Sequence, residues 1–268
     1  MKLFLVQMTS VKDVQLNLAV VKNFARQAEA AGCDLLILPE MFSQFGVSNN
    51  RELAGLEAEF NGPVGKAIRQ LAIEHGLWIV AGTVPVDAGD GQNPKARCHV
   101  INTEGEVVTC YDKIHLFDAD VGDKQGQYKE SDSYSHGDAP VVFDSPWGTL
   151  GLAVCYDLRF PEVFRQLNDL GAELVFLPSA FTYKTGQLHW DTLLRARAIE
   201  NGFFVAGVNQ TGQHDAKRQT WGRTQLVHPQ GQVESLIDEV AGLVVDVDLS
   251  EVKEFRVALP VNKHRRLS

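Results

Sequence analysis

Apolar runs and helical repeats alternate along the first half of the chain. The runs at residues 2–8 (KLFLVQM) and 34–40 (DLLILPE) are continuous enough to predict buried strands. Between them, four apolar residues fall at positions i, i+3, i+4 and i+7: Val21, Phe24, Ala25 and Ala28. This spacing places them on one face of a helix, and Gly32 supplies a signal for the helix end. The sequence therefore predicts a strand, an amphipathic helix and a second strand in this order.

The pattern continues from residue 61 to residue 115. Pro63 is suited to the first turn of a helix and Gly76 to its end. The residues between them place an apolar row at helical spacing: Val64, Ala67, Ile68 and Leu71. Three further apolar runs predict strands, the last two joined by a Glu-Gly turn: residues 77–85, 96–105 and 107–115. Alternation of strands and helices is typical of the α/β class.

The second half of the chain repeats the order of the first. Residues 30–40 (AAGCDLLILPE) align with residues 169–179 (DLGAELVFLPS), with Gly and Pro at matching positions. Two more segments match in the same order: GLWIVAGTVP with GFFVAGVNQ, and HVINTEGEV with QLVHPQGQV. These matches predict two related halves about a pseudo-twofold axis. Because each half combines strands with helices, we expect a four-layer α-β-β-α sandwich, formed by a single domain over residues 1–268.

One long segment interrupts this alternation. Residues 118–137 are polar and Gly-rich, which predicts a long surface loop. Loops of this length in compact domains often cover active sites. The segment is therefore a candidate for such a lid, and the sequence leaves its role open.

Composition narrows the classes of function. The chain has 268 residues, of which 44% are hydrophobic, and 25 basic against 34 acidic residues give a formal net charge of −9. An acidic chain without a basic patch argues against nucleic-acid binding. No apolar run approaches the roughly 18 residues of a membrane span, and the first ten residues lack the apolar core of a secretory signal. We expect a cytoplasmic protein that does not bind a membrane.

The cysteines are consistent with that expectation. Cys33, Cys98, Cys110 and Cys155 form no CxxC pair and show no metal-ligand spacing. Free thiols in a large acidic chain are typical of a reducing compartment. The chain also lacks a GxGxxG segment or a P-loop. We therefore expect neither a metal ion nor an organic cofactor.

Three polar residues stand at the ends of apolar strands: Glu40, Lys113 and Cys155. Neighbouring strands would bring their side chains to one edge of a sheet. A cysteine nucleophile needs a base that takes its proton, and a carboxylate shielded from water can do so because burial lifts its pKa. A lysine beside it would supply a fixed cation where an oxyanion develops. The three residues together predict acyl transfer through a thiol.

Each of the three also has a purely structural explanation. Glu40 could cap a turn, and Lys113 could pair with Asp112 or Asp118. Cys155 could be a core residue, because free cysteine is among the most buried residue types. Their shared placement at strand ends favours the functional interpretation.

Other nucleophilic schemes have weaker support. The chain contains no GxSxG segment, which a Ser-His-Asp hydrolase of the α/β type would carry. His99, His115 and His189 are available to a Cys-His enzyme, but the sequence offers none of them an orienting partner. We expect His115 and His189 to pack or to hydrogen-bond near the site.

Three blocks carry a resemblance to a known family: LPEMF at residues 38–42, YDKIHLFD at 111–118 and GLAVCYDLRFPE at 151–162. They resemble the signature blocks of the nitrilase superfamily, the carbon–nitrogen hydrolases, and the similarity extends over nearly the whole chain. The resemblance implies the four-layer sandwich, a homodimer and a catalytic triad of Glu40, Lys113 and Cys155. It also implies a second, supporting glutamate, which we place at Glu130 in YKESD.

Within the superfamily the chain resembles small amidases of 2-oxo acid amides, the omega-amidases and the deaminated glutathione amidases. This resemblance implies that Arg159 holds the substrate carboxylate, since a guanidinium fork matches a planar carboxylate. Arg159 could instead form a structural pair with Asp157 or Glu162. Phe181 and Thr185 match positions that line the pocket in this group.

The run GQHDAKR at residues 212–218 resembles a segment of the deaminated glutathione amidases. Their substrate carries a Cys-Gly dipeptide on its amide, so a second carboxylate must be accommodated. Lys217 and Arg218 could receive it, or could be solvated surface residues. The resemblance favours this substrate, cleaved through a cysteine thioester whose oxyanion would be held by Lys113 and the backbone N–H of Tyr156.

Two interpretations from other classes compete with hydrolysis. A non-catalytic binding module would be signalled by the loss of a triad residue, and none is lost. A thiol redox sensor built on Cys155 would need a resolving cysteine nearby, whereas the other cysteines fall in other predicted elements. We therefore expect an amidase with a small-molecule amide as its substrate.

Overall fold

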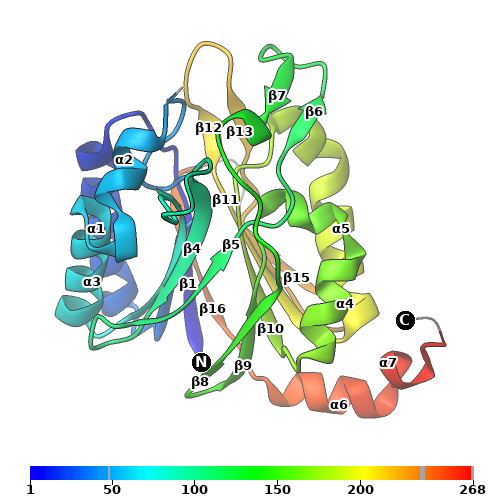
Figure 1. The fold of residues 1–268 in the computed structure, drawn as a ribbon. Coiled ribbons are helices and arrows are strands. Elements are labelled where there is room, and N and C mark those ends of the chain that lie inside the picture. The colour runs from blue at the N-terminus through cyan, green and yellow to red at the C-terminus, as the bar shows by residue number, and fades with distance from the viewer. Residues whose placement is uncertain (48, 236–238, 267–268) are drawn as a thin grey trace.

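Two six-stranded β-sheets packed face to face form the centre of the molecule, seen in a computed structural model that describes residues 1–47, 49–235 and 239–266 (Figure 1). The strands of the first sheet, in spatial order, are β16 (Ala241–Asp246), β1 (Lys2–Gln7), β2 (Leu35–Ile37), β3 (Trp78–Val86), β4 (Lys95–Ile101) and β5 (Val107–Asp112). Those of the second sheet are β15 (Val233–Ser235), β14 (Gln225–Val227), β11 (Phe204–Asn209), β10 (Leu174–Ser179), β9 (Gly148–Leu152) and β8 (Val141–Ser145).

Helices cover the outer faces of both sheets (Figure 1). The first sheet is covered by α1 (Val14–Ala30), α2 (Arg51–Leu56) and α3 (Pro63–His75), with the short 3₁₀ helix η1 (Ala58–Phe60) between the last two. The second sheet is covered by α4 (Pro161–Asp169) and α5 (Tyr183–Asn201), and α6 (Ser250–Ala258) and α7 (Val261–His264) follow β16 near the C-terminus. This is the α-β-β-α sandwich that the sequence predicts. Within the described ranges, no helix is long and apolar enough to cross a membrane.

The two sheets have the same topology, which confirms the predicted pair of related halves. Three parallel strands form the middle of each sheet, β1-β2-β3 in one and β9-β10-β11 in the other. An antiparallel hairpin extends each set on one side, β4-β5 or β14-β15. An antiparallel strand, β16 or β8, flanks it on the other side. The matching sequence segments correspond to β2 with β10, β3 with β11, and one hairpin with the other.

The side chains of β1 show how the layers pack. Successive residues of a strand point to opposite faces. Leu3 and Leu5 are fully buried in a core that includes residues of the second sheet, whereas Phe4 and Val6 belong to a separate core with α1 and α3. Both faces are therefore buried, which explains the continuous apolar run. Full burial of each such side chain contributes roughly 1.5–3 kcal/mol to folding.

The structure corrects two details of the sequence prediction. The strand expected over residues 34–40 spans only Leu35–Ile37, because Pro39 has no N–H for the strand ladder and the chain turns at Met41, where φ is 56°. Residues 118–137 are not a continuous loop. They form a hairpin of β6 (Asp118–Asp120) and β7 (Gln127–Lys129), followed by the 3₁₀ helix η2 (Glu130–Asp132).

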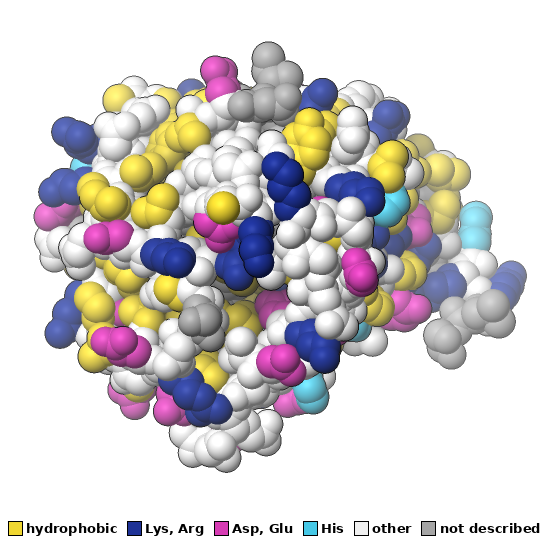
Figure 2. Space-filling model, turned by 90° about the horizontal axis from the view of Figure 1, so that it is seen from above, with side chains coloured by type: hydrophobic (Ala, Val, Ile, Leu, Met, Phe, Trp, Pro, Cys, Tyr) yellow, Lys and Arg dark blue, Asp and Glu magenta, His cyan; other side chains and the backbone are white. Residues whose placement is uncertain are grey.

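A second small hairpin, β12 (Thr211–Gln213) and β13 (Gln219–Trp221), stands at the same end of the molecule as β6 and β7 (Figure 1). Figure 2 views the molecule from this end, and several Lys and Arg side chains lie around the middle of the visible face. Asp and Glu side chains lie among them, so this face carries charges of both signs.

Candidate active site

Cys155 opens a 3₁₀ turn, η3 (Cys155–Arg159), shortly after β9 ends at Leu152. Its backbone has φ = 45°, a left-handed conformation that is uncommon for a residue other than glycine. Only 9% of the residue is exposed, and it lines two cavities. Backbone strain of this kind persists only where the surrounding structure imposes it. Cys155 is therefore a strained residue at a cavity wall rather than an ordinary core cysteine.

Glu40 reaches the same place from the first sheet. Its side chain is buried, and its Oε1 accepts a hydrogen bond of 2.8 Å from Lys113 Nζ. Its Oε2 accepts one of 2.8 Å from the backbone N–H of Ala180, which follows β10 in the second sheet. Gly82 makes room for this segment, since a Cβ there would lie 1.9 Å from the carbonyl oxygen of Pro39. The carboxylate thus spans the interface of the two halves.

Lys113 and Glu130 complete a buried charged cluster with Glu40. Lys113 follows β5, and its Nζ donates to both carboxylate oxygens of Glu130, at 3.0 and 2.8 Å. Glu130 Oε2 also accepts a hydrogen bond of 2.7 Å from the backbone N–H of Phe117. The hairpin of β6 and β7 therefore delivers Glu130 to the site, where the sequence places the supporting glutamate.

The structural pairing considered for Lys113 does not form. Lys113 pairs with the two glutamates, while Asp112 binds Arg97 through both oxygens at 2.6 and 2.9 Å. Asp118 instead accepts hydrogen bonds from the backbone and hydroxyl of Ser131. Neither aspartate takes part in the Lys113 cluster.

Burial and neighbouring charges shift the pKa of each group. Burial alone would lower the pKa of Lys113, but the carboxylates of Glu130 and Glu40 outweigh it and hold that pKa well above its ordinary value. Burial raises the pKa of Glu130 despite the nearby ammonium. Burial, followed by the negative charge of Glu40, raises the pKa of the Cys155 thiol well above its usual range. At neutral pH the site therefore contains a charged lysine and a protonated thiol.

A protonated thiol is a poor nucleophile, so chemistry at Cys155 requires a base. The Glu40 carboxylate is close enough to the thiol to raise its pKa and is therefore in position to take its proton. Lys113, bound to Glu40 at 2.8 Å, supplies a fixed positive charge in the wall of the same cavity. The arrangement can generate a thiolate and can stabilise negative charge that develops beside it.

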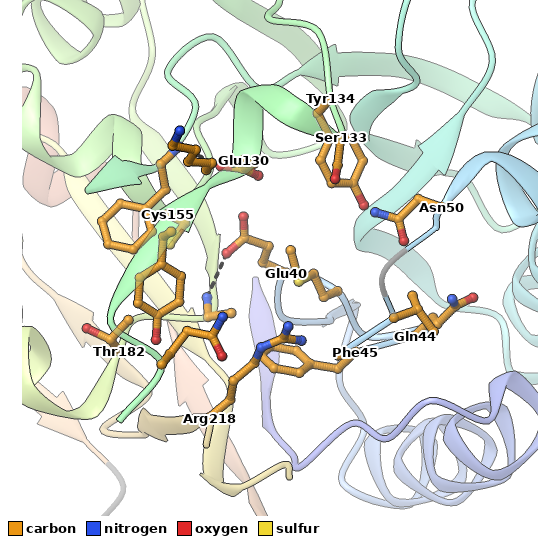
Figure 3. A pocket seen from close by; sticks show the side chains of 18 of the residues that line it. Glu40, Gln44, Phe45, Asn50, Glu130, Ser133, Tyr134, Cys155, Thr182 and Arg218 are labelled. Carbon is orange, nitrogen blue, oxygen red and sulfur yellow. Dashed lines mark hydrogen bonds between the residues drawn. The ribbon is translucent and has the colours of Figure 1, made fainter. Parts of the chain in front are cut away.

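A cavity of about 280 Å³ opens over these groups, with Glu40, Lys113, Glu130 and Cys155 in its wall. Figure 3 shows Glu40 near the centre of the view, with Arg218 and Phe45 on one side and Ser133 and Tyr134 on the other. The rest of the lining mixes aromatic and amide side chains, including Gln44, Asn50, Gln127 and Tyr128. Such a cavity is suited to a small polar molecule.

A second, narrower recess of about 20 Å³ also touches Cys155 and brings together three predicted substrate residues, Arg159, Phe181 and Thr185. The guanidinium of Arg159 lies 5.0 Å from the centre of the Phe181 ring, and its Nη1 is 3.2 Å from His189 Nδ1. Within the part of the chain that the structure describes, Arg159 forms no ion pair with an aspartate or glutamate. The structural pairs considered from the sequence are therefore absent there.

Lys217 and Arg218 lie in different surroundings. Arg218 lines the cavity that contains Cys155, and its Nη1 is 3.8 Å from Asp215 Oδ2. Lys217 is exposed and lines a separate cavity of about 440 Å³. The sequence treats the two as a pair, whereas the structure brings only Arg218 to the candidate site.

Two residues that organise the site were not recognised from the sequence. Asp157 is fully buried and binds both Tyr111 and His115, which lie on either side of Lys113. Gln210 is also fully buried, and its Nε2 donates a hydrogen bond of 3.0 Å to the backbone carbonyl oxygen of Glu40. The available signal was weak: Gln210 is a polar residue just after an apolar strand, and Asp157 lies inside a signature block.

The histidines near the site have structural partners. His115 Nδ1 lies 2.8 Å from Asp157 Oδ1, and its ring stacks on Phe160 at 3.6 Å. His189 contacts Arg159. Among the described residues, no cluster of three or more His, Cys, Asp or Glu side chains could hold a metal ion, and the four cysteines are free.

Known proteins resemble this chain along most of its length. The carbon–nitrogen hydrolase family profile matches residues 2–257. The chain is 37% identical over 265 residues to a deaminated glutathione amidase of Yersinia enterocolitica, covering 98% of this chain and 92% of that protein. It is 39% identical over 267 residues to a deaminated glutathione amidase of Homo sapiens, covering 97% and 80%.

A solved structure has the same fold. The crystal structure of the C. elegans NitFhit protein superposes with a TM-score of 0.90 at 36% identity, covering 99% of this chain and 65% of that one. A sandwich fold, the buried Glu-Lys-Glu cluster beside a strained cysteine and these similarities lead to one conclusion. This chain belongs to the carbon–nitrogen hydrolase family.

Proposed function

We propose that this protein is an amidase that hydrolyses the side-chain amide of a 2-oxo acid through a thioester on Cys155. The observation that supports this most directly is the buried Glu40 carboxylate, which contacts both the Lys113 ammonium and the Cys155 thiol beside a cavity of small-molecule size. A nucleophile, a base and a cation within mutual reach are the elements that acyl transfer requires.

In the first half of the reaction, Glu40 takes the thiol proton while the sulfur of Cys155 attacks the amide carbonyl carbon. The carbonyl π electrons move to oxygen, and Lys113 and the backbone N–H of Tyr156 hold the resulting oxyanion. When the tetrahedral intermediate collapses, the C–N bond breaks and the proton on Glu40 moves to the leaving nitrogen. The products of this half are a thioester and a free amine.

In the second half, Glu40 takes a proton from water as the water oxygen attacks the thioester carbon. A second oxyanion forms and collapses, the C–S bond breaks, and Glu40 returns the proton to sulfur. Glu130 supports both halves, because its contact with Lys113 at 2.8 Å keeps the ammonium in place.

Positive charge around the site favours an anionic substrate. Arg159 in the narrow recess is suited to the carboxylate of the 2-oxo acid, with Phe181 and Thr185 beside it.

The larger of the two cavities that contain Cys155 is suited to the leaving amine. Its volume of about 280 Å³ exceeds what ammonia needs, and Arg218 in its wall could pair with a carboxylate on that amine. Deaminated glutathione, which releases cysteinylglycine and 2-oxoglutarate, meets both requirements and is the substrate in the names of the Yersinia and human relatives. The alternative is an omega-amidase that acts on 2-oxoglutaramate or 2-oxosuccinamate.

We further propose that the enzyme works as a cytoplasmic homodimer. The four free cysteines suit a reducing compartment. Leu188 on α5 and Val257 on α6 are 67% and 83% exposed, and large exposed apolar side chains favour contact with a second copy.

The test is a panel of amides incubated with the purified protein while the released amine is followed. Deaminated glutathione should have the highest kcat/KM, and 2-oxoglutaramate and 2-oxosuccinamate should be the next best substrates. Absence of hydrolysis across the 2-oxo acid amides would overturn the proposal, and a preference for the simple monoamides would replace it with the omega-amidase alternative.

A further inference from the structure

A single buried carboxylate, that of Asp157, joins the segment of Lys113 to the turn of Cys155. Asp157 is fully buried and accepts four hydrogen bonds. Its donors are the Tyr111 hydroxyl (2.7 Å), the Val154 N–H (2.8 Å), the His115 N–H (3.0 Å) and the His115 ring nitrogen Nδ1 (2.8 Å). A buried carboxylate is unfavourable unless it is hydrogen-bonded, so these contacts hold it in this position.

The donors belong to the two chain segments that carry Lys113 and Cys155. Tyr111 lies two residues before Lys113 in the sequence, and His115 lies two residues after it. This segment continues from β5 of the first sheet. Val154 precedes Cys155, and its segment continues from the second sheet. Asp157 therefore ties together two pieces of chain that come from different sheets.

Asp157 also helps to hold the strained turn. Its own N–H donates a hydrogen bond of 3.0 Å to the carbonyl oxygen of Val154. Its side chain accepts a hydrogen bond from the N–H of the same residue. These two bonds close the turn in which Cys155 has φ = 45°. Neither cavity at Cys155 includes Asp157 among its described lining residues, so its action is indirect.

We propose that Asp157 is a positioning residue, which sets the Lys113 ammonium relative to the Tyr156 N–H so that both can reach one oxyanion. The inference rests on the proposed function, because it assumes that a tetrahedral intermediate forms at Cys155. Among the described residues the Tyr156 N–H has no hydrogen-bond acceptor, which leaves it available for this role. A shift of about 1 Å between such groups can cost roughly 10²-fold in rate.

We call the hydrogen bonds that Asp157 accepts from the two segments the brace. Two variants weaken this brace without removing the buried charge. Tyr111→Phe deletes one donor, and His115→Phe deletes the ring donor while keeping an aromatic ring to stack on Phe160. Asp157→Asn would bring an amide N–H₂ toward these donors and risks misfolding. The two donor variants therefore carry the test. Val21→Ala in α1, a substitution in the core cluster that does not include Tyr111 or Cys155, is the control for a general loss of stability.

Two rates measured on each variant separate positioning from general damage. Amide hydrolysis depends on the oxyanion, whereas alkylation of Cys155 by iodoacetamide displaces iodide and forms none. We expect each donor variant to lose about tenfold or more in kcat with little change in KM, and to keep its alkylation rate within about twofold. Val21→Ala, at a similar loss of Tm, should keep its kcat.

Other outcomes overturn the inference. An unchanged kcat in both donor variants would mean that the brace is only structural. A parallel loss of alkylation and hydrolysis would mean that the contacts act on the thiol rather than on the oxyanion. A wild-type protein that hydrolyses none of the amides would instead refute the proposed function, so the two failures are distinguishable.

Discussion

The ammonium of Lys113 lies 2.8 Å from the carboxylate of Glu40, although 73 residues separate them and β3 and β4 lie between their strands in the sheet. The contact forms because both chain segments leave the same edge of the first sheet and bend toward the second. The Glu40 carboxylate also accepts from Ala180 in the second half. One side chain therefore connects the oxyanion cation, the nucleophile and the interface of the two halves.

Cys155→Ala should abolish hydrolysis while the protein remains folded, because the nucleophile is removed and little volume changes. Intact-mass measurement with a slow amide should find an acyl adduct on the wild-type protein and none on the variant. Cys110→Ser, in β5, is the matched control and should keep its activity. An adduct confined to Cys33, Cys98 or Cys110, accompanied by loss of activity, would contradict the assignment.

Glu40→Gln should lower kcat by about 10²–10⁴-fold, the usual effect of losing a general base. Because burial raises the pKa of the Cys155 thiol, the variant must ionise that thiol unaided. Its alkylation by iodoacetamide should therefore keep increasing past the ordinary cysteine pKa of about 8.5. The surface change Glu29→Gln serves as the control. A near-wild-type kcat for Glu40→Gln would rule out this base.

Lys113→Met should lose about 10²–10³-fold in kcat and roughly 3–5 kcal/mol of stability, since it leaves the buried carboxylates of Glu40 and Glu130 without their cation. Burial already raises the pKa of Glu130, so the folded variant binds protons more readily than its unfolded chain. Its stability should therefore rise as the pH falls from 7 to 5. Thermal unfolding at both pH values checks the sign.

Adding Glu130→Gln to Lys113→Met removes one of the two unpaired charges. The double variant should recover part of the lost Tm but none of the activity, because no cation faces the oxyanion. Recovery of both would show that Lys113 acts only through stability.

Arg159→Lys should reduce kcat/KM on 2-oxo acid amides by about tenfold or more, because an ammonium cannot reproduce the guanidinium fork toward a carboxylate. Neutral aliphatic amides lack that carboxylate and should be affected much less. Arg195→Lys, an exposed change on α5, is the matched control. Equal losses on charged and neutral amides would indicate that Arg159 supports the fold rather than the substrate.

Arg218→Gln and Lys217→Gln form a pair that tests the leaving-group side. Only Arg218 lines the cavity of Cys155, so its loss should lower kcat/KM for deaminated glutathione by about tenfold, equivalent to roughly 1.4 kcal/mol. Lys217→Gln should have little effect on that substrate. Neither change should alter hydrolysis of 2-oxoglutaramate, which has no carboxylate on its leaving group. A larger effect of Lys217→Gln would contradict the proposed geometry.

Much of the architecture follows from the sequence because it is encoded locally. Burial of both strand faces requires continuous apolar runs, as in β1, and the helix ends require residues such as Pro63 and Gly76, whose φ is 60° in the structure. The internal repeat added the arrangement of the two halves. Glu40, Lys113 and Cys155 were recognisable because each follows an apolar strand in a characteristic block.

Contacts between distant segments were decided only by the tertiary structure. A hydrogen bond such as that from Tyr111 to Asp157 depends on how two sheets pack, and no local pattern encodes it. The same reason separates Lys217 from Arg218: the two are adjacent in the loop between β12 and β13, yet they line different cavities. The chain's local patterns thus determined the elements and the reactive residue types, whereas the packing of the halves determined which side chains meet.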